Sequence, residues 1–325
     1  MITFFSYWFN KFKKQEDHKH LDNFLKQFNA TPSQDELKVL ISSGDLSEKS
    51  WLLLANSYFK DGNYEKSIEI YSELLKVGSK SNSRDTMFLL AKTYFKAGFL
   101  ERSKKIFLEI LQANPRTPQA LRYLLLIYEH MKDYSSALEV LEPLEVLQES
   151  VTVESTYLRI LIILNNTELT SIERVEELLT IYKENHIFTY MIFEYIFRVD
   201  YKLAWKNLDS SKSELLVDIL YNLGREHLDL NIINKNGYLR ELYSAKGYIQ
   251  EAKSSSVFEF NVLINLDNSV NAKLSFEYVC DSCKNVYPFA FHRCSSCHSI
   301  DSSRVEMSLV KNYSKDFGEE NNSFQ

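Results

Sequence analysis

Four cysteines form two closely spaced pairs, and they are the only cysteines among the 325 residues. Cys280 and Cys283 make the first pair, and Cys294 and Cys297 make the second. A C-x2-C turn directs two thiolates toward one point, and two such turns can close a tetrahedral site of four sulfur ligands. The spacing therefore predicts a site for one metal ion, zinc or iron, with these four cysteines as ligands.

Four thiolates leave zinc no open coordination position, so zinc at this site is expected to be structural rather than catalytic. Iron in the same cage could exchange electrons, but the sequence offers no flavin or nicotinamide site as a redox partner. His292 and His298 flank the second pair and are alternative ligands, although four thiolates already complete the site. Adjacent disulfides are the other alternative, and clustering in a large chain without a cleavable signal pattern favours the metal.

Short strands are expected on either side of the cysteines. Residues 276–279 and 304–309 show the alternation of apolar and polar residues that is typical of strands. Residues 284–293 are expected to form the hairpin between the pairs, with Tyr287, Phe289 and Phe291 available to cover the site and to pack on neighbouring helices. A module of about 40 residues buries too little apolar area to fold alone, so metal binding is expected to supply much of its folding free energy.

Helical repeats precede this module. Three sets of residues recur at intervals of 36 and then 34 residues: Tyr58, Tyr94 and Tyr128; Ser67, Ser103 and Ala137; Tyr71, Phe107 and Leu141. Each unit holds two amphipathic helical segments separated by a polar turn, and Gly62 and Gly98 lie in the first two turns. The chain has only 8 glycines and 5 prolines, which favours helices joined by short turns over a β-sandwich or barrel.

This pattern resembles the tetratricopeptide repeat. The first unit has a residue of the expected type at each of these positions: Trp51, Leu54, Ala55, Tyr58, Gly62, Tyr64, Ser67 and Tyr71. Beyond residue 150 the repeat decays, and apolar spacing predicts helices over 154–165, 171–183, 188–208 and 213–228. Tyr243, Gly247 and Ala252 keep the offsets of one more degenerate unit, so a continuous solenoid is expected.

The predicted fold is mainly α: a tetratricopeptide-type α-solenoid with a small C-terminal rubredoxin-like or zinc-ribbon β module. The expected domains are an aromatic and basic N-terminal segment (1–20), the helical repeats (21–271), the tetracysteine module (272–311) and a flexible tail (312–325). The N-terminal segment is too short to span a bilayer, which takes about 20 apolar residues. It is interpreted either as a weak interfacial anchor or as a helix whose aromatic face packs on the domain.

The first helix of each repeat is expected to line a concave, partner-binding face. When the three repeats are aligned in this way, the predicted partner-binding residues are Leu52, Asn56, Phe59, Phe88, Lys92, Phe95, Arg122, Leu126 and Glu129. Mixed aromatic and polar groups are typical of grooves that bind helices or peptides. The alternative is that some of these side chains pack between repeats.

Other classes of function find little support in the sequence. A net charge of −6 argues against nucleic acid as the main partner. The sequence contains no Gly-rich phosphate loop, no H-E-x-x-H motif and no nucleophile elbow, so the protein is not expected to be an enzyme.

A tetratricopeptide solenoid followed by a tetracysteine module resembles the lipopolysaccharide assembly protein B family of Gram-negative bacteria. The most specific segments are Tyr278-Val-Cys-Asp-Ser-Cys283 and Phe291-His-Arg-Cys-Ser-Ser-Cys297, in which an aromatic residue precedes each pair. The resemblance implies a non-enzymatic adaptor at the cytoplasmic face of the inner membrane. Such an adaptor binds the lipid A deacetylase and promotes its degradation by a membrane AAA protease.

The chain departs from that family in three respects. The family begins with a transmembrane helix, whereas this chain begins with a short aromatic segment, so a cytoplasmic protein with peripheral membrane contact is expected. Lys284 and His298 stand where rubredoxin-like turns favour glycine at φ > 0, so strain is expected there. The later solenoid is divergent. A generic interaction scaffold of another complex, an iron-based electron carrier and a homodimer remain alternatives.

Overall fold

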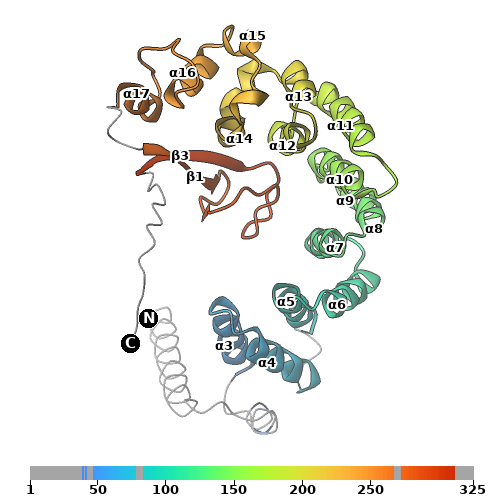
Figure 1. Cartoon of the computed structure of the whole chain (residues 1–325). Coiled ribbons are helices and arrows are strands. Elements are labelled where there is room, and N and C mark those ends of the chain that lie inside the picture. Colours follow the sequence, from blue (N-terminus) through green and yellow to red (C-terminus); the bar gives the residue numbers. More distant parts are fainter. Residues whose placement is uncertain (1–38, 40, 42–46, 78–82, 267–271, 312–325) are drawn as a thin grey trace, which may run out of the picture. The chain divides into compact units, whose positions relative to one another are not determined.

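The computed structural model describes residues 39, 41, 47–77, 83–266 and 272–311. The chain divides into two compact units, Met1–Val151 and Thr152–Gln325. Helices dominate the described parts of both units, and a small sheet occurs near the end of the second (Figure 1). These features confirm the predicted fold class. The predicted segments 1–20 and 312–325 lie outside the described residues.

The first unit consists of helices that pack in consecutive pairs (Figure 1). Its described helices are α3 (Glu48–Lys60), α4 (Tyr64–Val77), α5 (Ser83–Lys96), α6 (Leu100–Ala113), α7 (Pro118–His130), α8 (Tyr134–Glu139) and α9 (Leu141–Val146). Small residues at the recurring positions permit the close approach of each pair, and Ala55, Ala91 and Ala137 are fully buried. The Ser103 hydroxyl donates to the Ala91 carbonyl oxygen at 2.8 Å and so ties α6 to α5.

The turns within the three repeats share one backbone geometry. After the recurring tyrosines, a backbone N–H returns to the tyrosine carbonyl oxygen at 2.8 Å in the first repeat and 2.9 Å in the next two. Each turn needs one residue with positive φ, which is Gly62 at 78°, Gly98 at 83° and Lys132 at 59°. Glycine takes this conformation without steric cost, whereas lysine does not. The third turn therefore keeps the geometry of the first two although its sequence has diverged.

The second unit begins with two long helices and continues with shorter ones. Its described helices are α10 (Thr152–Asn165), α11 (Ser171–Asn185), α12 (Thr189–Val199), α13 (Tyr201–Asn207), η1 (Ser210–Leu216), α14 (Val217–Asn222), η2 (Arg225–His227), α15 (Leu230–Ile233), α16 (Gly237–Ala245) and α17 (Phe258–Asn265). Helices α10 and α11 confirm the predictions over 154–165 and 171–183. The remainder differs from the sequence prediction in three places.

The helix predicted over 188–208 is interrupted at Asp200. Its carboxylate accepts the backbone N–H groups of Lys202 and Leu203 at 2.9 and 3.0 Å, and this cap starts a new helix, α13. The helix predicted over 213–228 is reduced to α14 between two 3₁₀ turns. Ala252, whose offset matched one more degenerate repeat unit, lies in an irregular segment before α17. These differences arise where polar side chains satisfy the backbone locally.

The sheet has three antiparallel strands, β1 (Ala272–Cys280), β2 (Val286–Tyr287) and β3 (Ser303–Lys311), in the order β2-β1-β3. The two predicted strands are confirmed and are longer than predicted. Leu274 is buried in the core of the second unit, and Phe276, Val305 and Met307 pack against that core. The sheet therefore packs on the helices of its own unit, beside α12 and α14 (Figure 1).

Candidate metal centre

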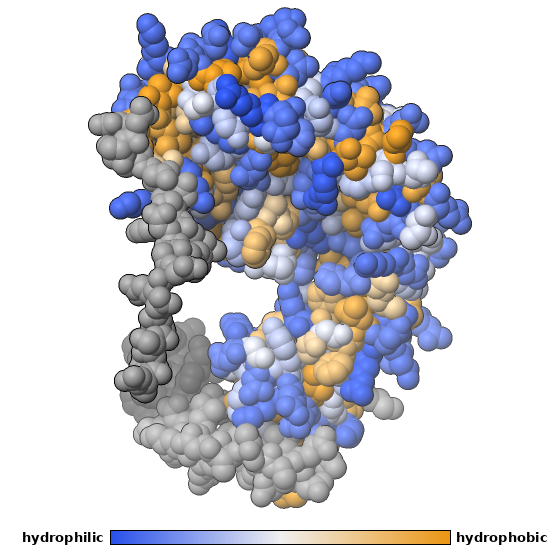
Figure 2. Space-filling model, in the orientation of Figure 1, coloured by the Kyte–Doolittle hydropathy of each residue, from blue (hydrophilic) through white to orange (hydrophobic). Residues whose placement is uncertain are grey.

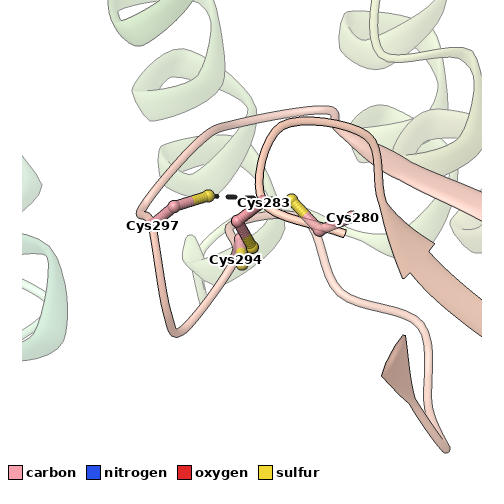
Figure 3. A group of neighbouring side chains, drawn as sticks. All are labelled: Cys280, Cys283, Cys294 and Cys297. Carbon is pink, nitrogen blue, oxygen red and sulfur yellow. Dashed lines mark hydrogen bonds between the residues drawn. The ribbon is translucent and has the colours of Figure 1, made fainter. Parts of the chain in front are cut away.

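The structure brings the four predicted metal ligands together. Their Sγ atoms all lie within 4.8 Å of one another. Cys280 lies 3.6 Å from Cys297, and Cys283 lies 3.7 Å from Cys294, so each close contact joins the two turns (Figure 3). Among the described residues, this cluster of four cysteines is the group that could hold a metal ion.

The two cysteine turns, residues 280–285 and 294–299, have the same backbone hydrogen bonds. The N–H of the leading cysteine donates to the carbonyl oxygen five residues later, at 2.9 Å in both turns. The carbonyl oxygen of the leading cysteine accepts the N–H four residues later, at 2.8 Å in the first turn and 2.9 Å in the second. The shared geometry directs the paired thiols toward one point from opposite sides.

A residue with positive φ completes each turn. Lys284 has φ 62° and His298 has φ 63°, which are the two positions where glycine is absent. The left-handed conformation costs a residue with a side chain roughly 1–2 kcal/mol. The expected strain is therefore present, and the turns keep their geometry in spite of it.

Three hydroxyl groups contact the sulfur atoms. The Ser299 hydroxyl lies 3.0 Å from Cys297 Sγ, and Ser299 and Ser302 each lie 3.4 Å from Cys280 Sγ. The Tyr287 hydroxyl lies 3.2 Å from Cys294 Sγ. The expectation that Tyr287 covers the site is in line with this contact. The two serines were missed, because a serine near a cysteine pair is too common to signal a role.

The thiol pKa values of Cys280, Cys283 and Cys294 are shifted in different directions because the surroundings of these sulfurs differ. Burial opposes ionisation of Cys280, but hydrogen bonds from the hydroxyls of Ser299 and Ser302 and from backbone N–H groups outweigh it and lower the pKa to about 5. For Cys283, a backbone bond from Asn285 acts to lower the pKa, but burial and the three neighbouring sulfurs raise it to about 12.

Burial also opposes ionisation of Cys294, but backbone N–H groups and the Tyr287 hydroxyl outweigh it and lower its pKa. Cys280 and Cys294, the leading residues of the two turns, are thus favoured as thiolates. The burial and the neighbouring sulfurs that raise the pKa of Cys283 disfavour a further negative charge in the cluster, which a bound cation would offset. Closely grouped soft donors with this charge pattern fit a tetrahedral zinc or iron ion.

The flanking aromatic and histidine side chains have different positions. His292 Nε2 lies 3.1 Å from Glu194 Oε2 on α12, and this hydrogen bond holds the pKa of Glu194 below its usual range. Phe291 packs edge-on against Tyr287, with ring centroids 4.8 Å apart. Phe289 is 79% exposed, so the expectation that it packs on the site or the helices is wrong. It lies at a bend just after β2, and its side chain is exposed to solvent. The expectation of a hairpin within residues 284–293 is also wrong, because β2 pairs with β1 across the first cysteine turn.

The strand that leads into the first turn is anchored to two helices through a buried carboxylate. Asp218 of α14 is 3% exposed and accepts the hydroxyls of Tyr190 on α12 at 2.6 Å and Tyr278 on β1 at 2.7 Å. Burial and the neighbouring carboxylate raise the pKa of both tyrosines well above the usual range, so both stay neutral donors. Tyr278 is the aromatic residue two positions before Cys280.

The loop that carries the second cysteine pair has contacts of its own with the helices. The Phe188 N–H donates to Asp301 Oδ2 at 3.3 Å, and the Arg293 guanidinium lies 5.0 Å from the centre of the Tyr157 ring. Together with the His292–Glu194 contact, these interactions link the loop to α10, α12 and the segment between α11 and α12. Both cysteine turns are therefore fixed to the helical part of the second unit.

The predicted partner-binding residues all lie in the first unit. Phe95 and Leu126 are each 6% exposed and belong to its core. The rings of Phe88 and Phe95 both lie 5.6 Å from that of Tyr123, and the Lys92 Nζ lies 5.1 Å from the centre of the Phe59 ring. Arg122 is exposed and pairs with Glu149; Leu52, Asn56, Phe59, Phe88, Lys92 and Glu129 are partly exposed.

Surface and helix properties bear on the expected membrane contact. The described surface on the face drawn in Figure 2 is mostly hydrophilic, with apolar patches between the polar areas. No helix in the described part of the chain combines the length and the apolar character needed to cross a membrane.

Comparison with known proteins identifies the repeats. Two tetratricopeptide repeat models match residues 48–77 and 88–144. A tetratricopeptide repeat protein from Parabacteroides merdae is 16% identical and covers 78% of this chain and 97% of its own, with a TM-score of 0.38. MamA from Desulfovibrio magneticus RS-1 is also 16% identical and covers 49% of this chain and 89% of its own, with a TM-score of 0.37. No curated protein matches the sequence. The chain therefore contains tetratricopeptide repeats between residues 48 and 144, and these repeats support a role in protein–protein interaction.

Proposed function

We propose that this protein is a non-enzymatic adaptor. In this proposal the repeats of the first unit bind a protein partner, and a structural metal ion stabilises the second unit. The observation that carries it is the combination of matched tetratricopeptide repeats with four sulfur atoms that lie within 4.8 Å of one another. Repeat surfaces act by binding, and a four-thiolate site has no position left for a substrate.

The metal would be held by Cys280, Cys283, Cys294 and Cys297. When bound, it ties the two cysteine turns together and neutralises their thiolates. The residues around it orient the sulfurs: Ser299, Ser302 and Tyr287 donate hydroxyl hydrogen bonds, and the backbone N–H groups of the turns do the same. Because donors surround the thiolates, their nucleophilicity is reduced, which suits a structural ion.

The partner we propose is the lipid A deacetylase, which the adaptor would present to a membrane AAA protease at the cytoplasmic face of the inner membrane. This assignment rests on the resemblance to lipopolysaccharide assembly protein B. It is supported by Tyr278, whose family position before the first cysteine pair is here the anchor of β1 on Asp218. The remaining members of the predicted partner-binding set that are partly exposed, including Asn56, Phe59 and Lys92, are the proposed contacts in the first unit.

Depletion of the protein in its native cell tests this function. The lifetime of the deacetylase, measured after translation is blocked, should lengthen several-fold. Re-expression of the wild-type chain should restore rapid turnover, whereas Cys283→Ser should not, because it removes one metal ligand. The matched control is Ser282→Ala, a change at an exposed neighbour in the same turn. An unchanged deacetylase lifetime on depletion would contradict the lipopolysaccharide role and favour a scaffold for another complex.

The dependence on metal is tested with purified components. The full-length chain should capture the deacetylase when its metal is present and lose most of that capture after the metal is removed with a chelator. Restoring zinc or iron should restore binding. Equal capture with and without metal would show that the second unit does not need the ion to bind this partner.

A further inference from the structure

One edge of the sheet has no strand beside it in the part of the chain that the structure describes. The order β2-β1-β3 leaves β3 at that edge. The Asp281 N–H donates to the Ser302 carbonyl oxygen at 2.8 Å. This bond shows which residues of β3 direct their N–H and C=O groups toward β1 and which direct them away. Hydrogen-bonded pairs alternate along such a ladder, so the N–H and C=O groups of Val305, Met307 and Leu309 point away from β1.

These outward groups have no hydrogen-bond partner among the described residues. The same alternation is seen on β1, where the N–H groups of Leu274 and Cys280 point away from β3, toward Tyr221 and Asn285. A free edge of this kind is a template for an added strand, because each outward N–H and C=O can pair with an extended peptide. Proteins that do not use such an edge usually shield it with proline, a bulge or a covering segment.

A cavity of about 530 Å³ lies along this edge. Ser303, Val305 and Met307 line one side, and Val217 and Tyr238 are among the residues that line the rest. Its size lies within the range of about 300–1,000 Å³ that is typical of ligand sites. The Ser303 hydroxyl is buried and has no hydrogen-bond partner in the described structure, so the cavity also offers an unused polar group.

The charges around the cavity favour a basic group. Both cations of the lining have partners: the Lys212 Nζ donates to the His186 carbonyl oxygen at 2.5 Å, and Arg304 pairs with Asp281 and Glu306 at 3.2 and 2.9 Å. Glu214 and Asp301 also line the cavity, and neither forms an ion pair with any residue that the structure describes. The Lys212 charge acts on the Asp301 carboxylate, so the exposed Glu214 is the carboxylate of the lining that remains to attract a positive charge.

We propose that this groove, formed by the free edge of β3 and the adjoining cavity, binds an extended segment of a partner protein by strand addition. The segment pairs with the backbone of Val305 and Met307, places alternate apolar side chains in the cavity and brings a lysine or arginine to Glu214. This inference rests on the proposed adaptor function for the existence of a partner. Its test uses displayed peptides, so failure here would leave the deacetylase experiments unaffected.

The first test selects peptides from a displayed random library on the immobilised full-length protein. Selected peptides should alternate apolar residues and carry a basic one, and they should bind Met307→Pro at least tenfold more weakly than the wild type. The Met307 N–H points away from β1, so proline removes an outward donor and leaves the β1–β3 ladder intact. Met307→Leu is the matched control and should bind as the wild type does. Equal binding to Met307→Pro and the wild type would overturn the proposal.

The same peptides provide two further checks. N-methylation at alternate residues keeps the side chains but blocks strand pairing, so it should abolish binding. Glu214→Gln should weaken the binding of peptides with a lysine and leave unchanged the binding of versions with glutamine in its place, whereas Glu251→Gln, outside the cavity lining, should change neither. If N-methylated peptides bind equally well, recognition does not use the β3 edge and the proposal fails.

Hydrogen exchange decides whether the edge is open in the intact protein. The amides of Val305 and Met307 should exchange rapidly in the free full-length chain, and a selected peptide should protect them. The amides of Arg304 and Glu306, which face β1, should be protected in both states. Protection of Val305 and Met307 in the free chain would mean that another part of the chain or a second copy covers the edge, and would overturn the proposal.

Discussion

The residues that complete the two cysteine turns store strain that a substitution can release. Lys284 and His298 occupy left-handed backbone conformations, which glycine adopts without steric cost. Lys284→Gly and His298→Gly should each raise the free energy of unfolding of the metal-bound protein by about 1 kcal/mol. Thermal or denaturant unfolding of the purified protein measures this change.

A control separates strain relief from a general effect of glycine. Asn234 is exposed and ends α15 with φ −66°, a conformation that gives glycine no advantage. Asn234→Gly should leave stability unchanged or lower it slightly. If Lys284→Gly and His298→Gly behave like Asn234→Gly, the positive φ values carry no energetic cost and the reading of these turns is wrong.

Asp301 gives the second unit a pH dependence of defined sign. The residue as a whole is exposed, but desolvation of its carboxyl group by the surrounding protein raises the pKa above the usual value, although the Phe188 N–H and the charges of His292 and Lys212 act in the opposite direction. A raised pKa means that the folded state favours the protonated acid, so stability is lost as pH rises through the folded pKa. Asparagine cannot ionise, still accepts a hydrogen bond and tolerates positive φ, which Asp301 has at 49°.

Asp301→Asn should therefore stabilise the protein at pH 7 and have a vanishing effect below about pH 4, where the unfolded carboxyl group is also protonated. Unfolding midpoints measured from pH 4 to pH 7 test the trend, with Glu251→Gln as the control. A stabilisation that is constant with pH, or that becomes smaller toward pH 7, would contradict a raised pKa of Asp301.

Asp218 fixes the arrangement of three elements, α12, α14 and β1. The hydrogen bonds from Tyr190 and Tyr278 reach a buried carboxylate, and bonds to charged groups contribute about 1.5–3 kcal/mol each. Tyr278→Phe and Tyr190→Phe should each lower the free energy of unfolding by roughly that amount. Tyr201→Phe is the control and should have little effect, since its hydroxyl forms no hydrogen bond with a described residue. Losses under about 0.5 kcal/mol for both variants would show that the Asp218 contacts do not hold β1.

Local pattern predicted the elements that depend on neighbours in sequence. The cysteine turns, the early repeats, α10, α11 and the strands that flank the cysteines all have short-range signals. The contacts between these elements have no short-range signal in the sequence. Tyr278 and Asp218 are 60 residues apart, and Phe188 and Asp301 are 113 residues apart. The break at Asp200 was missed for a related reason. The apolar residues before and after Asp200 keep the spacing of one continuous helix. Only the hydrogen bonds that its carboxylate accepts from the backbone show that a new helix begins there.

The whole molecule contains separate cores. The core of the second unit extends from Tyr157 to Leu274 and includes side chains of the sheet, whereas the clusters around Trp51 and Phe107 belong to the first unit. Removal of the metal should therefore loosen the second unit selectively. Hydrogen exchange should rise in residues 272–311 and in α12 and α14 after chelation, and α3 to α7 should be unchanged. An equal rise in both units, or no rise in either, would contradict a metal that stabilises the second unit alone.

The central claim is that four cysteines hold one structural metal ion in a repeat scaffold. Native mass spectrometry of the intact protein tests it most directly, because the mass distinguishes a zinc complex, an iron complex, four free thiols and two disulfides. We predict the mass of the chain plus one zinc or iron ion, and loss of that ion in Cys280→Ser. A mass that corresponds to the metal-free chain, with thiols or with disulfides, would contradict the account.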